Sequence, residues 1–251
     1  MPAIFDRVIT VYGRKPVLEA LEDTALECYR LHLADSNKAS PILDEMLALA
    51  QRRGVEQVYH SKKELSRISR KGAQDQGVAL DVLCPAFMTL EELLQTPTGK
   101  TPKRLLAADG LTNPQNAGML IRSAVAGGID GILWPRDGNA ALGPLAVKAS
   151  AGTLFKAPLV RCRKLADALR QCQQHGYRVV VLEANAELSL FDAPTQGDAI
   201  YVLGNESSGI SAEVADLADS AVSIPMHNDV ESLNVAVTAA LITYSTAYLE
   251  R

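Results

Sequence analysis

Three polar segments of the chain contain the side chains that could do chemistry. They carry, in chain order, Asn116 and Arg122, then Glu206, then Ser232 and Asn234. The planar guanidinium of an arginine can hold a phosphate group through two parallel hydrogen bonds. A carboxylate can orient such an arginine or accept a proton, and amide and hydroxyl groups can position both. These residue types therefore favour a site for an anionic ligand.

Each polar segment lies between a predicted strand and a predicted helix. The strands are expected at 105–108, 199–203 and 221–224, and the helices at 116–127, 211–217 and 232–249. Loops at the carboxyl ends of parallel strands form the ligand sites of α/β proteins, so the segments predict one such site. Ser232 is expected to cap the last helix with its hydroxyl, which is also a common structural role for serine.

The alternation of strands and helices predicts an α/β protein with two domains. A small N-terminal domain is expected at residues 1–95, a linker rich in Pro, Gly, Thr and Lys at 96–103, and a larger domain at 104–251. In the first domain, strands are expected at 8–11, 29–33, 55–60 and up to about 83, with helices starting near 16 and at 41–53 and 62–69. In the second domain, periodicity alone predicts an ordinary doubly wound sheet, because knots are rare.

The composition excludes several classes of protein. No apolar run is long enough to span a membrane, and the N-terminus contains Asp6 and Arg7 instead of a secretion signal. The four cysteines and four histidines show no metal-ligand or disulfide spacing, so we expect no metal and a reducing, cytoplasmic location. The formal net charge is −4, yet basic residues cluster between Arg52 and Lys71, a pattern that suits nucleic acid or an ordinary solvated surface.

The three polar segments resemble motifs one, two and three of the SpoU/TrmH family of RNA ribose 2′-O-methyltransferases, in the SPOUT superfamily. The resemblance is strong over residues 104–251. It is weaker in the N-terminal part, where Tyr12-Gly13 and Gln76-Gly77-Val78 match the family's RNA substrate-binding domain. It implies a C-terminal domain with a trefoil knot, S-adenosylmethionine as the cofactor, and a homodimer with its active sites at the subunit interface.

The resemblance also implies roles for individual residues. Arg122 would clamp the phosphate and orient the ribose hydroxyl, or act as the general base, which is demanding for a side chain that stays protonated. Glu206 would hold an arginine or take part in proton removal, and Asn116, Ser232 and Asn234 would complete the catalytic set. The cofactor would be held largely through backbone groups, by Thr153, Leu203, Gly204, Ile224, Met226 and Leu233.

The function expected from the resemblance is methyl transfer to a ribose 2′-hydroxyl of structured RNA, ribosomal RNA rather than transfer RNA. A non-catalytic RNA-binding or assembly protein that keeps the fold is the alternative, and methylation of a base is a third, weaker one. Two loop segments depart from the usual family pattern, namely the glycine-free stretch 226–229 and the pair Ser207 and Ser208. These departures affect loop shape and the choice of substrate.

Overall fold

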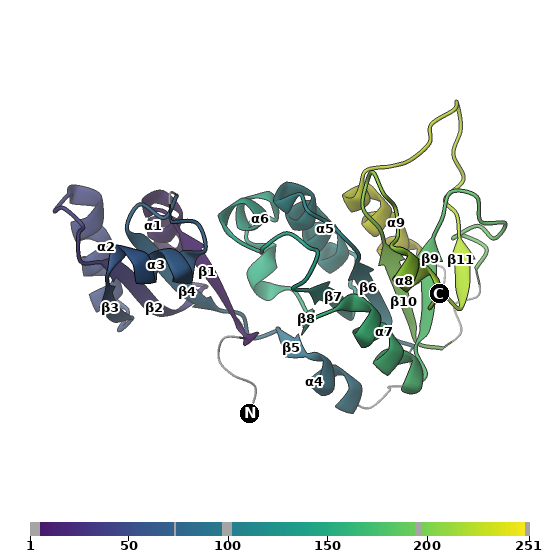
Figure 1. Ribbon diagram of the computed structural model, residues 1–251, viewed down its shortest axis with the longest axis horizontal. Helices are drawn as coiled ribbons and strands as arrows, with labels where there is room; N and C mark the ends of the chain where they lie inside the picture. The colour runs from purple at the N-terminus through teal and green to yellow at the C-terminus, as the bar shows by residue number, and fades with distance from the viewer. Residues whose placement is uncertain (1–5, 73, 97–101, 194–196, 249–251) are drawn as a thin grey trace. The chain divides into compact units, whose positions relative to one another are not determined.

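The computed structural model describes residues 6–72, 74–96, 102–193 and 197–248 of the 251-residue chain (Figure 1). The chain divides into two compact units between Pro85 and Ala86. Each unit has its own β-sheet.

The first unit is a sheet of four strands in the order β1-β4-β2-β3. The strands are β1 (Val8–Tyr12), β2 (Glu27–Ala34), β3 (Glu56–His60) and β4 (Val78–Leu83), and the helices are α1 (Arg14–Glu22), α2 (Pro41–Arg52) and α3 (Lys62–Ser69). Strand β4 runs antiparallel to both neighbours, whereas β2 and β3 are parallel. Helix α3 starts with a capping box, in which Ser61 and Glu64 each bond the other's backbone amide.

The second unit is built on a parallel sheet of seven strands in the order β11-β9-β10-β6-β7-β8-β5. In chain order its strands are β5 (Met88–Thr89), β6 (Arg104–Ala108), β7 (Gly131–Pro135), β8 (Leu159–Cys162), β9 (Arg178–Leu182), β10 (Ala199–Leu203) and β11 (Ser220–Val222). Its helices are α4 (Leu90–Gln95), α5 (Pro114–Ala126), α6 (Pro144–Ala149), the 3-10 helix η2 (Thr153–Lys156), α7 (Leu165–Gln174), α8 (Ala212–Ala215) and α9 (Val235–Tyr248).

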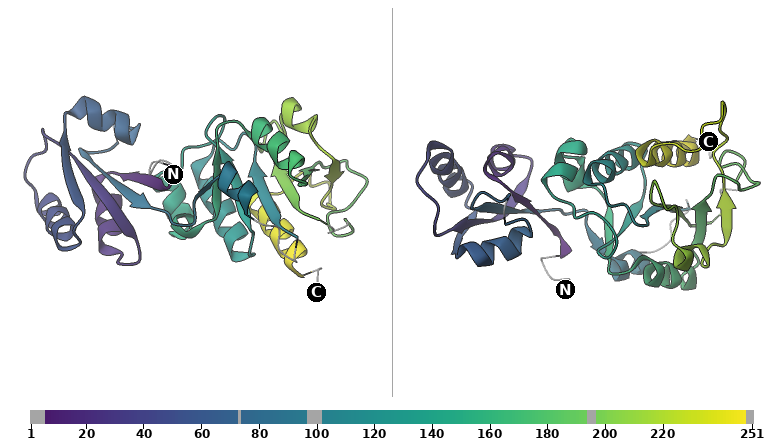
Figure 2. Two further views of the ribbon diagram at one scale, coloured as in Figure 1. Left: turned by 90° about the horizontal axis from the view of Figure 1, so that it is seen from below. Right: turned by 45° about the horizontal axis from the view of Figure 1, so that its top comes forward.

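Helices cover both faces of this parallel sheet, as Figure 2 shows. Helices α5, α6 and α9 pack on one face, and α4, α7 and α8 lie on the other. Every residue of β6, β7 and β10 is buried, which is the pattern expected for central parallel strands covered on both sides. Alternate residues of β6 and β10, such as Leu105 and Ile200, join the side chains of α7 in one apolar core.

Most predicted elements of both units are present, with some corrected bounds. The division between the units precedes the expected linker, because β5 pairs with β8 and Leu93 of α4 is buried in the core of the second unit. Residues 97–101 of that linker lie outside the described residues. Between α6 and β8 the chain forms the short helix η2, and β8 begins only at Leu159. None of the helices in the described parts of the chain has the length and apolar character needed to cross a membrane.

Candidate active site

Strands β6 and β10 bring the first two polar segments together at the carboxyl end of the sheet. They are parallel neighbours in register, with Ala108 opposite Leu203 at their carboxyl ends. The amide of Asp109 continues the ladder by donating to the Leu203 carbonyl at 2.8 Å, and the Asp109 carboxylate accepts from the Ser211 amide at 2.7 Å. The two loops are therefore tied together where they leave the sheet.

Two asparagines hold the loop that leads from β6 into α5. Asn139 accepts from the Leu111 amide at 2.8 Å and donates to the Ala108 carbonyl at 3.0 Å. Asn113 caps α5, since its side-chain oxygen accepts from the amides of Gln115 and Asn116. These bonds fix the first turn of α5, which carries Asn116.

The loop after β10 closes on itself around Asn205. The backbone amide and carbonyl of Asn205 both pair with Gly209 at 2.9 Å, and its side chain donates to the Gly110 carbonyl at 2.7 Å. A Cβ atom at Gly204 would lie 2.4 Å from the backbone carbon of Gly209, so the loop requires glycine there for steric reasons. The side-chain oxygen of Asn205 also accepts from two amides of the loop, those of Ser207 and Ser208.

Asn116 joins all three polar segments through its side chain. Its Nδ2 atom donates to Glu206 Oε1 at 2.5 Å, and its Oδ1 atom accepts from Asn234 Nδ2 at 3.4 Å. These partners are 90 and 118 residues away in sequence. The structure thus brings three of the predicted catalytic residues into one hydrogen-bonded chain.

The last helix begins later than the sequence predicts. Helix α9 starts at Val235, and the Asn234 side chain caps it by accepting from the Ala236 amide at 2.9 Å. The expected cap, Ser232, lies before the helix with an exposed side chain, so that prediction is wrong. Asparagine at 234 satisfies the helix amides and contacts Asn116 at the same time, which a serine two residues earlier cannot do.

Arg122 lies on α5 but is not part of the hydrogen-bonded chain. It follows Asn116 by six residues, which turns it roughly 120° around the helix axis. Its side chain is exposed, and no other described residue gives it a hydrogen bond or ion pair. The guanidinium is thus left available to a group from outside the chain.

The residues predicted to hold the cofactor lie in several places. Leu203 ends β10 with a buried side chain, and Gly204 follows it. Ile224, Met226 and Leu233 lie in the loop between β11 and α9, each half-buried. Thr153 starts η2, which packs against α5 and α6, and its side chain has no hydrogen bond to the other predicted site residues within the described structure.

Some residues of the site were not predicted. Asp109, Asn113, Asn139 and Asn205 hold the loops in place, although none of them was singled out from the sequence. The sequence feature that could have identified them is an asparagine or aspartate in a loop that follows a strand, but such residues are also common in ordinary turns. The thiols of Cys162 and Cys172 offer no nucleophile, because burial raises the pKa of each to about 12.

The fold and the site define a parallel α/β protein whose polar residues meet at the carboxyl ends of two central strands. Residues 103–244 match the SpoU rRNA Methylase family, and residues 10–83 match the family described as RNA 2′-O ribose methyltransferase substrate binding. The chain therefore belongs to the SpoU methylase family of RNA methyltransferases, as the three motifs predicted.

Individual relatives agree with this assignment. A Mycobacterium avium (strain 104) protein named as an uncharacterized tRNA/rRNA methyltransferase is 32% identical over 93% of this chain and 75% of its own length. The SpoU methyltransferase AviRb of Streptomyces viridochromogenes is 25% identical, with a TM-score of 0.62 over 96% of this chain and 88% of its own. An AdoMet-bound rRNA methyltransferase from Sinorhizobium meliloti has the same fold, with 23% identity and a TM-score of 0.64 over 96% of this chain and 87% of its own.

Proposed function

We propose that this chain transfers a methyl group from S-adenosylmethionine to a ribose 2′-hydroxyl of structured RNA, ribosomal RNA in preference to transfer RNA. The observation that carries this proposal is the hydrogen-bonded chain from Glu206 through Asn116 to Asn234, with Arg122 on the same helix as Asn116 and without a partner among the described residues. An intact polar set of this kind favours catalysis over the alternative of an RNA-binding protein that only keeps the fold.

The residues present fit an S-adenosylmethionine site. Gly204 keeps the loop after β10 compact and free of a side chain, and Ile224 and Leu233 supply half-buried apolar surface in the loop before α9. Backbone groups of these loops would bind the polar atoms of the cofactor, and the apolar side chains would contact its adenine ring. The cofactor supplies an electrophilic methyl group when it is bound.

The side chains of the protein would position the ribose and handle its proton. Arg122 would hold the phosphate next to the reacting ribose, because a guanidinium matches phosphate geometry and stays charged. Glu206 would accept the hydroxyl proton or pass it to water, while the Asn116 amide holds one of its oxygens in place. Asn234 in turn holds the oxygen of Asn116 and starts α9 at the same time.

The test uses total RNA from a strain that lacks this protein and labelled S-adenosylmethionine. The wild type should place label on a 2′-O-methyl nucleoside, mapped by nuclease digestion and then to one site in ribosomal RNA. Arg122→Ala should lower the rate by about a hundredfold or more, as for other groups that stabilise developing charge. Arg170→Ala is the matched control, because this exposed arginine lies on α7, across the sheet, and its loss should change the rate less than about twofold.

Other results would redirect the proposal. Label on a base would contradict the ribose assignment, and label only in transfer RNA would overturn the preference for ribosomal RNA. Absence of both methyl transfer and cofactor binding would favour the non-catalytic alternative.

The proposal extends to the assembly and topology of the chain. We infer a homodimer, supported by three exposed apolar side chains on the adjacent helices α5 and α9, namely Met119, Val237 and Tyr244. Light scattering should then give twice the chain mass for the wild type and the single chain mass for Val237→Glu. A trefoil knot formed by the loops around β11 and a cytoplasmic location, where free thiols persist, follow from the family resemblance.

A further inference from the structure

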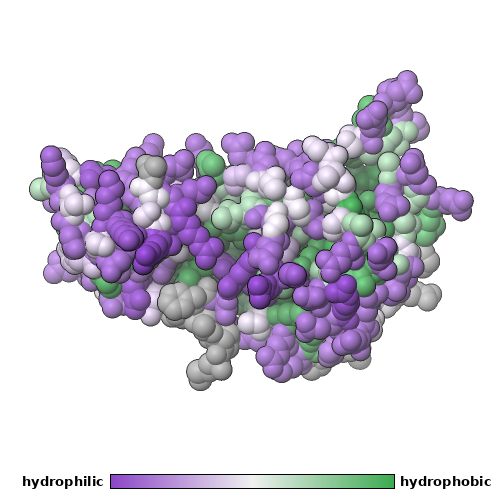
Figure 3. Space-filling model, viewed as in Figure 1, coloured by the Kyte–Doolittle hydropathy of each residue, from purple (hydrophilic) through white to green (hydrophobic). Residues whose placement is uncertain are grey.

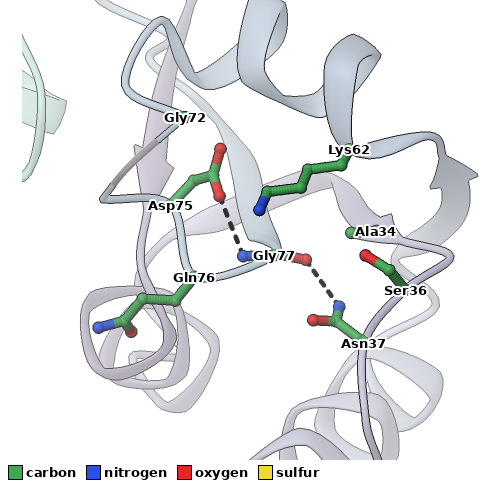
Figure 4. Close-up of a pocket in the computed structure, with 8 residues that line it drawn as sticks. All are labelled: Ala34, Ser36, Asn37, Lys62, Gly72, Asp75, Gln76 and Gly77. Carbon is green, nitrogen blue, oxygen red and sulfur yellow. Dashed lines mark hydrogen bonds between the residues drawn. The ribbon is translucent and has the colours of Figure 1, made fainter.

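The first unit contains a half-open cavity of about 300 Å³ that is lined by three segments. Ser36 and Asn37 come from the turn after β2, Lys62 from the start of α3, and Asp75 and Gly77 from the turn before β4 (Figure 4). This volume is at the small end of the range for ligand pockets in proteins. None of these residues belongs to the candidate active site.

The floor of this cavity is held by hydrogen bonds. Asn37 donates to the Gly77 carbonyl at 2.7 Å, and the Gly77 amide donates to Asp75 at 3.0 Å. A Cβ atom at Gly77 would lie 2.1 Å from the side-chain oxygen of Asn37, and φ at this residue is +80°, so only glycine fits. The other oxygen of Asp75 accepts from the Ser69 hydroxyl at 2.8 Å, so the buried Asp75 carboxylate is part of the wall.

Two polar groups of the cavity are left open for a ligand. The Lys62 side chain reaches across the cavity toward Gly77, while Gln76 points away from it (Figure 4). In the described part of the chain, neither the Lys62 ammonium nor the Ser36 hydroxyl has a hydrogen bond or ion pair. A ligand that carries an anionic oxygen and a hydroxyl group would satisfy both.

The surroundings of the cavity are basic, although the chain as a whole is acidic. Helix α3 and the turn after it expose Lys63, Arg67, Arg70 and Lys71, and hydrophilic residues cover most of this unit on the face in Figure 3. Such a local excess of positive charge attracts phosphate groups over the first Debye length. These positive charges, together with Lys62, outnumber the carboxylates of Asp35, Glu64 and Asp75 in the same segments.

We propose that this cavity binds one ribose-phosphate unit of the substrate RNA, with the phosphate at Lys62 and the ribose 2′-hydroxyl at Ser36. The inference rests on the proposed function, because it is RNA that the chain must hold during methyl transfer. The cavity would anchor a nucleotide other than the one that reacts. Its contact with a 2′-hydroxyl would distinguish RNA from DNA.

The test compares two neighbouring lysines in the full-length protein. Filter binding measures affinity for large-subunit ribosomal RNA from a strain that lacks this protein, at several salt concentrations. Lys62→Met should weaken binding about tenfold, as expected for one charge-assisted hydrogen bond, and should lower the salt dependence by about one counterion. Lys63→Met removes the same charge from the same exposed turn but does not line the cavity, so binding should weaken less than about threefold.

A second variant tests the contact with the sugar. Ser36→Ala should weaken binding of a structured RNA hairpin about fivefold, as for one neutral hydrogen bond. Binding of a DNA hairpin of the same sequence should be unchanged by this substitution. Circular dichroism of all variants checks that the exposed substitutions leave the fold intact.

The outcomes separate this site from the proposed function, because methyl transfer is measured on the same samples. Equal RNA affinity of Lys62→Met and Lys63→Met, in samples whose wild type methylates RNA, would overturn the cavity proposal alone. A selective loss in Lys62→Met without methyl transfer by the wild type would support the cavity and overturn the proposed function. Binding of inorganic phosphate at low millimolar concentration that Lys62→Met abolishes, with no change in the RNA affinity of the same variant, would show a site for free phosphate and overturn the RNA assignment.

Discussion

The loops after β6 and β10 differ sharply from the loop between β11 and α9. The first two are bound to each other and to the sheet, through Asp109, Asn139 and Asn205. The third runs away from the sheet in Figure 1, and residues 227–232 are all exposed. In this loop Asn228 and Asp229 both have φ near +57°, a conformation that non-glycine residues adopt at some cost.

This difference indicates that the loops have separate functions. The loops after β6 and β10 are already in place for Asn116 and Glu206, so they need no rearrangement to act. The loop before α9 carries Ile224, Met226 and Leu233, which are the residues predicted to contact the cofactor. Because few hydrogen bonds hold it, cofactor binding is the event that would order this loop.

The largest expected effect on stability and cofactor affinity comes from disturbing the loop after β10, which hydrogen bonds already hold in place. Gly204→Ala would force a Cβ atom against the backbone of Gly209 and Ile210. We expect the free energy of unfolding to fall by about 2–3 kcal/mol, and the affinity for S-adenosylmethionine to fall about a hundredfold because the loop is displaced. Urea denaturation and calorimetric titration measure these two quantities.

A glycine far from the site provides the control for this variant. Gly176→Ala places a Cβ atom in open space at φ +87°, so it should cost only about 1 kcal/mol and leave cofactor affinity unchanged. Equal effects of the two substitutions would show that the loop after β10 has room to adjust.

The next prediction compares the loops directly by limited proteolysis. Glu206 and Glu231 are both exposed, but only Glu206 lies in a loop that is closed by hydrogen bonds. A glutamate-specific protease should therefore cleave after Glu231 at least about tenfold faster than after Glu206. S-adenosylmethionine at a hundred times its Kd should slow the cut at Glu231 by up to about a hundredfold. Mass spectrometry of the fragments gives both rates. A cleavage rate after Glu231 that S-adenosylmethionine does not change would argue against a loop that becomes ordered when the cofactor binds.

A pair of helix caps gives a smaller effect that separates stability from function. Asn113 caps α5 and Asn234 caps α9, so replacing either by alanine should lower the free energy of unfolding by about 1 kcal/mol. Asn234→Ala also removes a partner of Asn116, so methyl transfer should fall about tenfold, and by clearly more than in Asn113→Ala. If the activities fell equally, the role of Asn234 would be structural alone.

The smallest expected effect concerns the reactivity of the thiols of Cys162 and Cys172, on the face of the sheet opposite the site. Burial raises the pKa of Cys162 and Cys172 to about 12, so both thiols stay protonated up to pH 9. Iodoacetamide at pH 8 should leave both unmodified in the native protein and alkylate both in 6 M guanidinium, as read by peptide mass. Rapid alkylation in the native state would show that this face opens readily.

Much of this molecule could be predicted from local sequence patterns. The apolar runs at 105–108 and 199–203 mark the central strands closely, and the glycine after residue 53 marks the end of α2. Helix starts were harder, since Ser232 and Asn234 are both good caps and only the contact with Asn116 favours the second. The pairing of β5 with β8 was also hidden, because a two-residue strand has no periodicity.

The contacts made by Asn116 have a consequence for the time at which the protein becomes active. Its partner Asn234 is 118 residues further along the chain, so a growing chain cannot complete the site until Asn234 has been synthesised. At about 5–20 residues per second this delay is roughly 6–24 s. For most of that interval the nascent second unit lacks β10, which is the central neighbour of β6, and pairings at such separation also form slowly. The protein is therefore expected to gain activity only after α9 has been synthesised and has packed against α5.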